Sequence, residues 1–347
     1  MTKENLFGKT LPELQKIVVK LGFQKFVAKQ IAEWMYKKRV HSFEEMRNLS
    51  KPTQEKLGEK YMVQHTPFSK VQESTDGTKK YLFPVKPNQF IETAYIPDGE
   101  RATLCVSSQV GCKMGCLFCM TGKQGFQGNL STGEILNQIF NIAEFEKLTN
   151  IVYMGMGEPF DNLDEVLKSV EILTADYGLA WSPKRITVST IGITPALKRF
   201  LNESKANLAV SLHSPFEDER KNLMPIESVY HLPKLLEEIR NFDFGGQRRV
   251  SFEYIMFKGV NDQHRHINEL AKILNGIKCR INLIRFHPIP GTPLESSSNE
   301  EIARFQSGLK RKGIVTTIRA SRGEDIFAAC GLLSTKELVK RQKNEDY

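Results

Sequence analysis

The spacing of apolar positions changes character along the 347-residue chain. In the first 62 residues, apolar side chains recur three and four positions apart, which predicts amphipathic helices. Residues 69–97 alternate instead, and Asp76-Gly77 lies between two strand-like runs, which predicts a small β-hairpin and a further strand. We therefore place a boundary near residue 95. The predicted helices cover residues 11–23, 27–40 and 42–61, and the further strand covers residues 89–97.

From residue 96 onward, short apolar runs alternate with stretches of helical spacing. Six or more βα units with short connections predict an α/β fold in which a parallel sheet curls into a partial (β/α)6-type barrel of the TIM kind. We expect residues 1–95 to form an N-terminal accessory domain, helical with a small β-hairpin, residues 96–320 the barrel core and residues 321–347 a C-terminal segment. The predicted strands cover residues 102–107, 150–159, 185–192, 206–214, 249–261, 281–291 and 315–321. The predicted helices begin at Ser131 and cover residues 163–178, 194–204, 232–242, 266–277 and 299–313.

Composition narrows the class of protein. No signal peptide and no membrane-spanning apolar run are recognisable, so we expect a cytoplasmic protein with no membrane partner. The net charge is +9, and residues 1–62 carry thirteen Lys and Arg against seven Asp and Glu. Such an excess favours a polyanion such as nucleic acid, although a solvated basic surface is an equal alternative. Six cysteines, three of them clustered, indicate metal binding or chemistry rather than a disulfide framework.

Polar residues collect where the predicted strands end. Because the carboxyl ends of barrel strands meet at one rim, six such ends predict a site there, although any single one could be a simple strand terminator. They comprise the cysteine loop at 112–119, Gly157-Glu158-Pro159, Ser189-Thr190, Ser211-Leu212-His213, Gly259-Val260-Asn261 and His287-Pro288.

The cysteine loop has the spacing C-x3-C-x2-C, formed by Cys112, Cys116 and Cys119. A structural zinc site needs four ligands, and Cys105 could serve as the fourth, but it lies inside an apolar strand. A [4Fe–4S] cluster held by three thiolates leaves one iron open to chelate a small molecule. The number three therefore favours a cluster that binds a substrate or cofactor.

This loop, with Phe118 directly before its last cysteine, resembles the radical S-adenosylmethionine (radical SAM) superfamily. The resemblance is strengthened by "GMGEP", residues 155–159, at the end of the next strand. It implies a [4Fe–4S] cluster whose open iron binds S-adenosylmethionine and cleaves it to a 5′-deoxyadenosyl radical. It also implies an electron donor such as a flavodoxin or ferredoxin.

Further motifs, among them "GERATLCVSSQVGC", "AVSLHSPFEDERKNLMPI" and "RASRGEDIFAACG", resemble the dual-specificity RNA methyltransferases that methylate carbon 2 of adenine in 23S ribosomal RNA and in tRNA. The resemblance extends over most of residues 90–333 and implies 23S rRNA and tRNA as partners of a monomeric enzyme. A related antibiotic-resistance methyltransferase acts on carbon 8 of the same adenine and is the alternative enzyme. A zinc-stapled RNA-binding module is the non-enzyme alternative.

The resemblance implies a chemical route and its residues. Cys330 accepts a methyl group from one S-adenosylmethionine, and the radical made from a second activates that methyl for addition to carbon 2, which is too electron-poor to attack the donor itself. Cys105 then resolves the protein–RNA adduct through a transient disulfide with Cys330. Glu92 matches the proton acceptor of the family. From the residues alone, Cys105 and Cys330 could equally be core residues, and Glu92 an exposed strand residue paired with a lysine.

The same resemblance implies the residues that contact S-adenosylmethionine. His287 departs from the Asn that many relatives have at its position, but it can still donate a hydrogen bond. Leu332 departs from the Gln of many relatives, and we expect little effect on the chemistry. The implied contacts are Gly157 and Glu158 at the methionine end, Ser189, Ser211, Leu212 and His213 on the ribose and adenine side, and His287.

Overall fold

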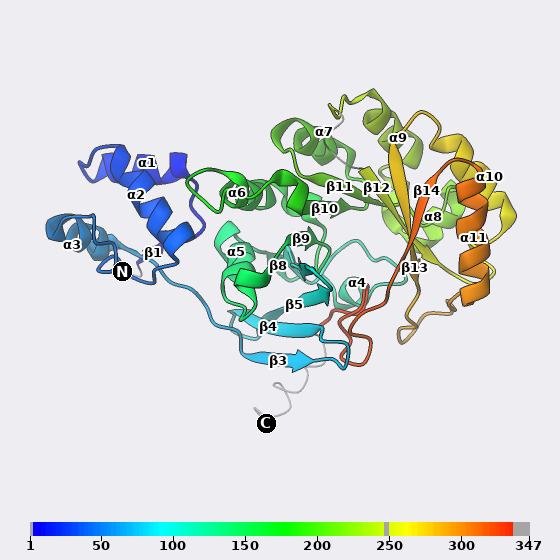
Figure 1. Ribbon diagram of the computed structural model, residues 1–347, viewed down its shortest axis with the longest axis horizontal. Helices are drawn as coiled ribbons and strands as arrows, with labels where there is room; N and C mark the ends of the chain where they lie inside the picture. Colours follow the sequence, from blue (N-terminus) through cyan, green and yellow to red (C-terminus); the bar gives the residue numbers. More distant parts are fainter. Residues whose placement is uncertain (1–2, 246–249, 336–347) are drawn as a thin grey trace.

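The computed structural model describes residues 3–245 and 250–335, and a ten-stranded sheet dominates it (Figure 1). The strand order is β14-β13-β12-β11-β10-β9-β6-β5-β4-β3. Along this order, every neighbouring pair from β14 to β6 is parallel, and the sheet stays open, because no pairing of the described residues joins β14 to β3. The predicted α/β fold with a partial barrel is confirmed. The parallel strands are β6 (Arg101–Cys105), β9 (Asn150–Tyr153), β10 (Ile186–Thr190), β11 (Asn207–Ser211), β12 (Val250–Met256), β13 (Cys279–Arg285) and β14 (Val315–Arg319).

Helices between these strands cover the outside of the sheet (Figure 1). The predicted start at Ser131 is confirmed, since Ser131 caps α5 and its backbone N–H donates to Glu134 at 2.7 Å in a capping box. Two short helices, α4 (Met120–Gln124) and the mostly charged α8 (Glu217–Leu223), were not predicted. The helices are α5 (Thr132–Phe140), α6 (Leu163–Thr174), α7 (Thr194–Glu203), α9 (Leu232–Asn241), α10 (His264–Ile273) and α11 (Asn299–Arg311).

The N-terminal helices lie at one end of the molecule (Figure 1). They are α1 (Leu11–Lys20), α2 (Phe26–Glu33), continued by a π-helical turn at Trp34–Lys38, and α3 (Lys51–Lys60). The prediction of one helix over residues 42–61 is wrong, because residues 42–50 form turns and bends. Ser50 caps α3 and Pro52 lies in its first turn, where its missing N–H costs nothing; inside a longer helix it would break the ladder.

The hairpin strands β3 (Lys70–Glu73), β4 (Lys79–Lys86) and β5 (Gln89–Asp98) are antiparallel and continue the main sheet, because β5 pairs with β6. Residue 95 therefore lies within β5, and the division of the chain at residues 95 and 320 stays a prediction. Part of the predicted C-terminal segment, residues 336–347, lies outside the described residues. Short pairings join β1 (Glu4–Asn5) to β2 (Tyr61–Met62) and β7 (Gln109–Val110) to β8 (Gly128–Asn129).

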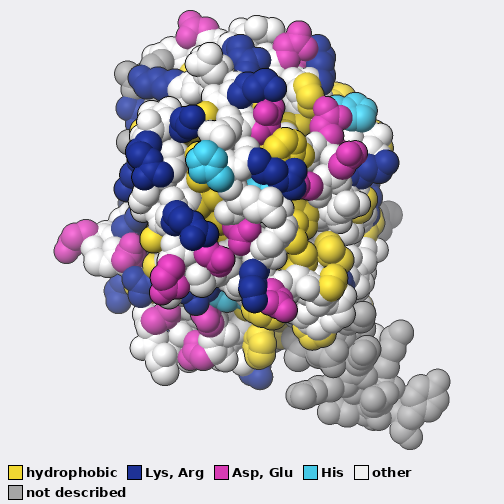
Figure 2. Space-filling model, turned by 90° about the vertical axis from the view of Figure 1, so that its right-hand side faces the viewer, with side chains coloured by type: hydrophobic (Ala, Val, Ile, Leu, Met, Phe, Trp, Pro, Cys, Tyr) yellow, Lys and Arg dark blue, Asp and Glu magenta, His cyan; other side chains and the backbone are white. Residues whose placement is uncertain are grey.

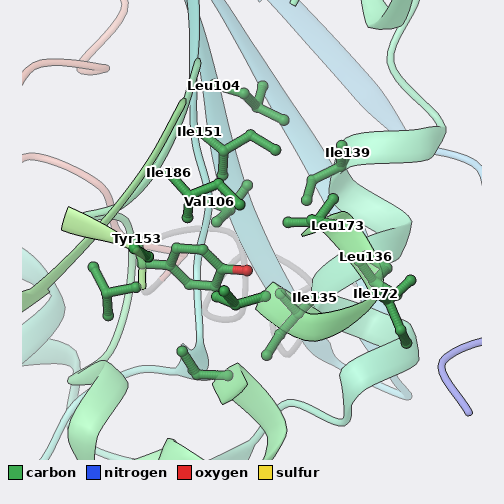
Figure 3. Packing of buried hydrophobic residues seen from close by; sticks show 14 of the residues in the cluster. Leu104, Val106, Ile135, Leu136, Ile139, Ile151, Tyr153, Ile172, Leu173 and Ile186 are labelled. Atoms are coloured by element: carbon green, nitrogen blue, oxygen red, sulfur yellow. The ribbon is translucent and has the colours of Figure 1, made fainter. Parts of the chain in front are cut away.

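Part of the main core lies between the sheet and the helices α5 and α6 (Figure 3). Leu104 and Ile151 come from adjacent parallel strands, and the ring of Tyr153 points among the side chains of both helices. The Tyr153 hydroxyl lies 2.7 Å from Ser169 Oγ, so its polar tip is satisfied inside an apolar layer. This packing fixes the strand ends that follow it in sequence.

The surface differs between the two ends of the molecule. On the end that carries α10 and α11, Lys and Arg alternate with Asp and Glu, with apolar side chains between them (Figure 2). The basic excess of residues 1–62 belongs to the opposite end (Figure 1). Within residues 3–245 and 250–335, no helix is long and apolar enough to span a bilayer.

Candidate active site

A cavity of about 230 Å³ lies at the carboxyl ends of the parallel strands, beside the cysteine loop and a stretch of the C-terminal region. It is where barrel enzymes place their chemistry. The structure brings most of the predicted site residues to its wall, from positions more than 200 apart in sequence. These are Cys105, Cys112, Cys116, Cys119, Gly157, Glu158, Ser189, Ser211, His213, His287 and Cys330.

The cysteine loop is shaped by close backbone contacts. Gly111 has φ +72°, and a side chain there would meet Gly125 O at 1.7 Å, so only glycine fits. Burial raises the pKa of the Cys112 thiol to about 12 and that of Cys116 well above its usual value. Thiols so desolvated stay protonated unless a metal replaces the proton, which suits ligands whose task is to hold iron.

The spacing of the ligand atoms separates the metal hypotheses. Two thiolates on one zinc ion lie about 3.8 Å apart, given bonds of about 2.3 Å in a tetrahedron. Among the described residues, only Glu217, Glu227 and His231 form a group of three or more candidate ligands with all ligand atoms within 4.8 Å. The three thiols of the loop do not all lie that close to one another, so the loop does not form a closed three-thiol zinc site.

Glu158 is buried beside the loop, and its carboxylate accepts hydrogen bonds from the backbone N–H groups of Phe160 (3.0 Å) and Ile191 (3.1 Å). Burial raises its pKa to about 7, against the lowering effect of these bonds. Gly157 has φ +99°, and a Cβ there would lie 2.5 Å from Gln109 Cβ. Glu158 is thus a buried carboxyl on the cavity wall, whose ionised form a nearby cation would favour.

His213 is held by hydrogen bonds to both its side chain and its backbone. Its Nδ1 accepts from Ile255 N at 3.0 Å, and its backbone oxygen accepts from Asn261 Nδ2 at 2.6 Å. Burial lowers its pKa to about 3, with a contribution from Arg220, so the ring is neutral and Nε2 carries the proton. The ring packs edge-on against Phe118, at 4.7 Å between centroids, which joins the end of β11 to the cysteine loop.

Leu212, the neighbour of His213, is fully buried in the main core and does not line the cavity. Only its backbone serves the site, through a hydrogen bond from Leu212 N to Glu253 O at 3.0 Å. His287 does line the cavity, and its Nε2 lies 3.0 Å from Ser321 Oγ.

Cys105 and Cys330 lie on the same cavity wall although 225 positions separate them. Cys105 ends β6 and packs in a small cluster with Ile326 and Ala328, which precede Cys330. Burial, reinforced by the neighbouring Cys330, raises the pKa of Cys105 to about 12, whereas Cys330 is exposed. We call residues 321–335 the Cys330 segment.

Glu92 is buried on β5 but is absent from the cavity wall. Its Oε1 pairs with Lys80 Nζ at 3.0 Å, and its Oε2 accepts from Ser334 N at 2.9 Å. Burial raises its pKa, and Lys80 opposes that shift. The structure therefore places Glu92 beneath the Cys330 segment.

Two ion pairs at the site, one buried and one partly buried, were not predicted from the sequence. Glu253 pairs with Arg319, which lines the cavity, at 3.3 Å. Arg220 pairs with Glu227 and donates to Ile191 O at 2.7 Å and Ser211 O at 3.1 Å, next to the ends of β10 and β11. An acidic residue inside the apolar run of β12 was a signal for Glu253, but nothing local marks Arg220 among the exposed charges of α8.

Comparison with known proteins agrees with the geometry. The family model of the radical SAM superfamily matches residues 106–271, and that of the ribosomal RNA large subunit methyltransferase N-terminal domain matches residues 4–63. The chain is 59% identical over 332 residues to the probable dual-specificity RNA methyltransferase RlmN of Porphyromonas gingivalis, which is 96% of this chain and 97% of that protein. It is 42% identical over 345 residues to the dual-specificity RNA methyltransferase RlmN of Syntrophus aciditrophicus, which is 98% and 99% of the two chains.

A solved structure has the same fold over nearly the whole chain. The crystal structure of a radical SAM methyltransferase from Sphaerobacter thermophilus matches with a TM-score of 0.87 and 39% identity, covering 95% of this chain and 99% of that one. Because these relatives are methyltransferases, the alternative of a non-enzymatic zinc module is wrong. The choice between carbon 2 and carbon 8 of adenine is a separate question.

Proposed function

Because the chain belongs to the RlmN family of dual-specificity RNA methyltransferases, within the radical SAM superfamily, we propose that it methylates carbon 2 of an adenine in 23S ribosomal RNA and in tRNA. One observation carries the proposal. Two lone cysteines, Cys105 and Cys330, share a cavity wall with the three cysteines of the loop. A methyl donor alone would not require them, but a methyl group carried on the protein and then released does.

The loop cysteines suit a [4Fe–4S] cluster, because all three line the cavity, two of them buried, and they do not form a closed zinc site. Cys112, Cys116 and Cys119 would hold it, leaving a position for S-adenosylmethionine. When bound, the two would supply the methyl group and a carbon radical. Glu158 would pair with the ammonium of the methionine moiety, while Gly157 gives the backbone room to approach it. Ser189, Ser211, His213 and His287 would line the rest of the cofactor, with Leu212 acting through its backbone.

Cys330 would carry the methyl group as a thioether. Its exposed position suits a nucleophile that must meet first the donor and then the base. Cys105 would release the methylated base by forming a disulfide with Cys330 that is later reduced. The shared packing of Cys105 with Ile326 and Ala328 supports this pairing, because it keeps the two cysteines on one wall. Glu92 would accept a proton at this stage, although its carboxylate is also bonded to Lys80 and Ser334.

The target adenine would leave its stack to enter the cavity, which costs least in a loop or hairpin end. Residues 1–95, with the basic N-terminal helices, would bind the surrounding RNA, residues 96–320 would form the catalytic barrel, and the segment from residue 321 would carry the acceptor.

Anaerobic methylation of deproteinised 23S rRNA and of tRNA, followed by mass mapping of the modified nucleotide, tests the proposal. We expect 2-methyladenine in both RNAs. Finding 8-methyladenine would instead assign the chain to the carbon-8 reaction, and modification of only one RNA would remove the dual specificity.

A further inference from the structure

The Cys330 segment touches the cysteine loop directly. Helix α4 (Met120–Gln124) begins immediately after Cys119. Met120 N donates to Gly331 O at 2.8 Å, and Thr121 Oγ1 donates to Leu333 O at 2.7 Å. Both bonds reach residues within three positions of Cys330. The short helix that follows the last cysteine of the loop therefore also contacts the segment that carries Cys330.

Gln124, the last residue of α4, makes the largest number of these contacts. Its Oε1 accepts from Thr335 N at 2.9 Å and from Ser334 Oγ at 3.2 Å, and its Nε2 donates to Thr335 Oγ1 at 2.9 Å. Both the oxygen and the nitrogen of the Gln124 amide thus form hydrogen bonds to the Cys330 segment, which lies more than 200 positions away in sequence. Thr335 is fully buried, so these bonds are shielded from water.

The other side of the segment is held by β5. Ser334 N donates to Glu92 Oε2 at 2.9 Å, and Thr335 Oγ1 donates to Phe90 O at 3.3 Å. Ser334 and Thr335 are therefore clamped between α4 and β5. Toward Cys330 itself, the backbone turns at Gly331 with φ +83°, where a Cβ would lie 3.1 Å from Phe118 O. The exposed thiol is thus displayed by a turn whose far end is fixed by Gln124.

We propose that Gln124 is a positioning residue for the methyl acceptor: it fixes the Cys330 segment to the cluster-binding loop, so that the acceptor sulfur and the cluster keep one mutual placement. This inference rests on the proposed role of Cys330. The acceptor must meet a donor bound beside the cysteine loop, and a misplacement of an ångström can cost about a hundredfold in rate. Side-chain bonds from α4 supply that placement where no strand pairing exists for residues 330–335.

The test compares Gln124→Ala with Gln124→Glu, which keeps an acceptor oxygen for Thr335 N and Ser334 Oγ, and with Gln127→Ala as the matched control. Gln127 is an exposed glutamine three positions on, and no side-chain hydrogen bond links it to the described residues of the segment. In cluster-loaded protein, hydrogen exchange of the peptide covering residues 326–335 reports the anchoring, and single-turnover methylation of Cys330 reports the placement.

For Gln124→Ala we expect roughly tenfold faster exchange in that peptide, equivalent to about 1.4 kcal/mol, because several buried hydrogen bonds are lost together. Methyl transfer to Cys330 should slow by at least a similar factor, with unchanged iron content and unchanged affinity for S-adenosylmethionine. Gln124→Glu should retain most of both properties, and Gln127→Ala should match the wild type.

Wild-type exchange and wild-type transfer in Gln124→Ala would overturn the proposal, as would faster exchange with undiminished transfer. If Gln124→Ala fails to load the cluster, Thr335→Val provides the test, because it removes the hydroxyl bonded to Gln124 and Phe90 without changing the cysteine loop. Wild-type hydrogen exchange in Thr335→Val would equally overturn the proposal. If the wild type never methylates Cys330, the proposed route fails, whereas the exchange result still judges the anchoring alone.

Discussion

The cavity has two walls that are built in different ways. One, the strand-end wall, consists of Glu158, Ser189, Ser211 and His213, which end or follow strands of the parallel sheet. The other is the part of the Cys330 segment that lines the cavity, residues 321–322, 328–331 and 333. Backbone ladders fix the first wall, whereas side-chain bonds and a small apolar cluster hold the second.

The difference fits two tasks. A cofactor site benefits from rigid groups set in advance, because their ordering is achieved once, on folding. A methyl acceptor that serves two partners in turn needs an accessible sulfur on a segment with less regular support. Cys105 ends β6 of the sheet but packs against Ile326 and Ala328 of the Cys330 segment, so the proposed disulfide would tie that segment to the sheet.

The largest effect on methylation should come from replacing a cysteine of the loop that lies beside both walls. Replacing Cys112, Cys116 or Cys119 with Ala should abolish iron binding and methylation together, because each would supply one of three cluster ligands. Wild-type protein purified without oxygen should be brown and contain about four irons. Cys279→Ala is the control, since Cys279 lies at the start of β13 and does not line the cavity. A loop variant with full iron content would contradict the ligand assignment.

Replacing either of the two lone cysteines should stop the reaction, but at different steps. Cys105→Ala should keep the cluster and accumulate protein cross-linked to RNA through Cys330, because the adduct forms but is not resolved. Denaturing gels with labelled RNA would detect the adduct. Cys330→Ala and the double variant should retain the cluster and form neither adduct nor methylated RNA. If Cys105 is only a packed core residue, its replacement by Ala would lower stability yet release methylated RNA normally.

The strand-end wall was the more predictable of the two. Apolar runs followed by polar strand ends place Glu158, Ser189 and Ser211 at one rim for any parallel barrel. The start of α5 was likewise predictable from its capping box. The helix expected over residues 42–61 begins only at Lys51, because the cap at Ser50 and the proline after it set the start of α3. The remaining features of the fold depend on contacts between residues that are distant in sequence.

The Cys330 segment could not be worked out in that way. Its partners Gln124 and Glu92 lie more than 200 positions away, and no local pattern marks either side chain as an anchor. The identity of Cys330 and Cys105 came from motif resemblance, and the residues alone left both as possible core positions. Leu212 illustrates the converse, because the motif includes it while its side chain serves only the core.

A pH experiment sharpens the account of the strand-end wall. The pKa of Glu158 is about 7 in the folded chain, raised by burial from an ordinary value of 4.5. The folded state therefore holds a proton that the unfolded state has lost between these values, so stability due to this group is complete below pH 4.5 and is lost as the pH rises to about 7. Relative to Glu158→Gln, the cluster-free wild type should lose up to about 3 kcal/mol of unfolding free energy across that window.

Urea denaturation at several pH values measures this difference, and other titrating groups cancel because both proteins contain them. A parallel pH dependence for the two proteins would contradict the buried-carboxyl assignment. Binding of S-adenosylmethionine at pH 6 should release a proton in the wild type only, because an ammonium partner favours the ionised carboxylate. Calorimetry in buffers of different ionisation enthalpy would detect the release.

The smallest effect should come from Leu332, two residues after Cys330. Its side chain is half-buried and packs against the apolar cluster that includes Cys112, Met114 and Phe118. Leu332→Gln removes part of that contact but leaves the backbone N–H, which donates to Ala329 O at 3.1 Å. We expect a loss of about 1 kcal/mol in stability and methylation within twofold of the wild type. Denaturation and turnover assays on the same preparation test both. A large fall in turnover with normal stability would mean that this side chain, and not only the anchors at Gln124 and Glu92, sets the position of the acceptor sulfur.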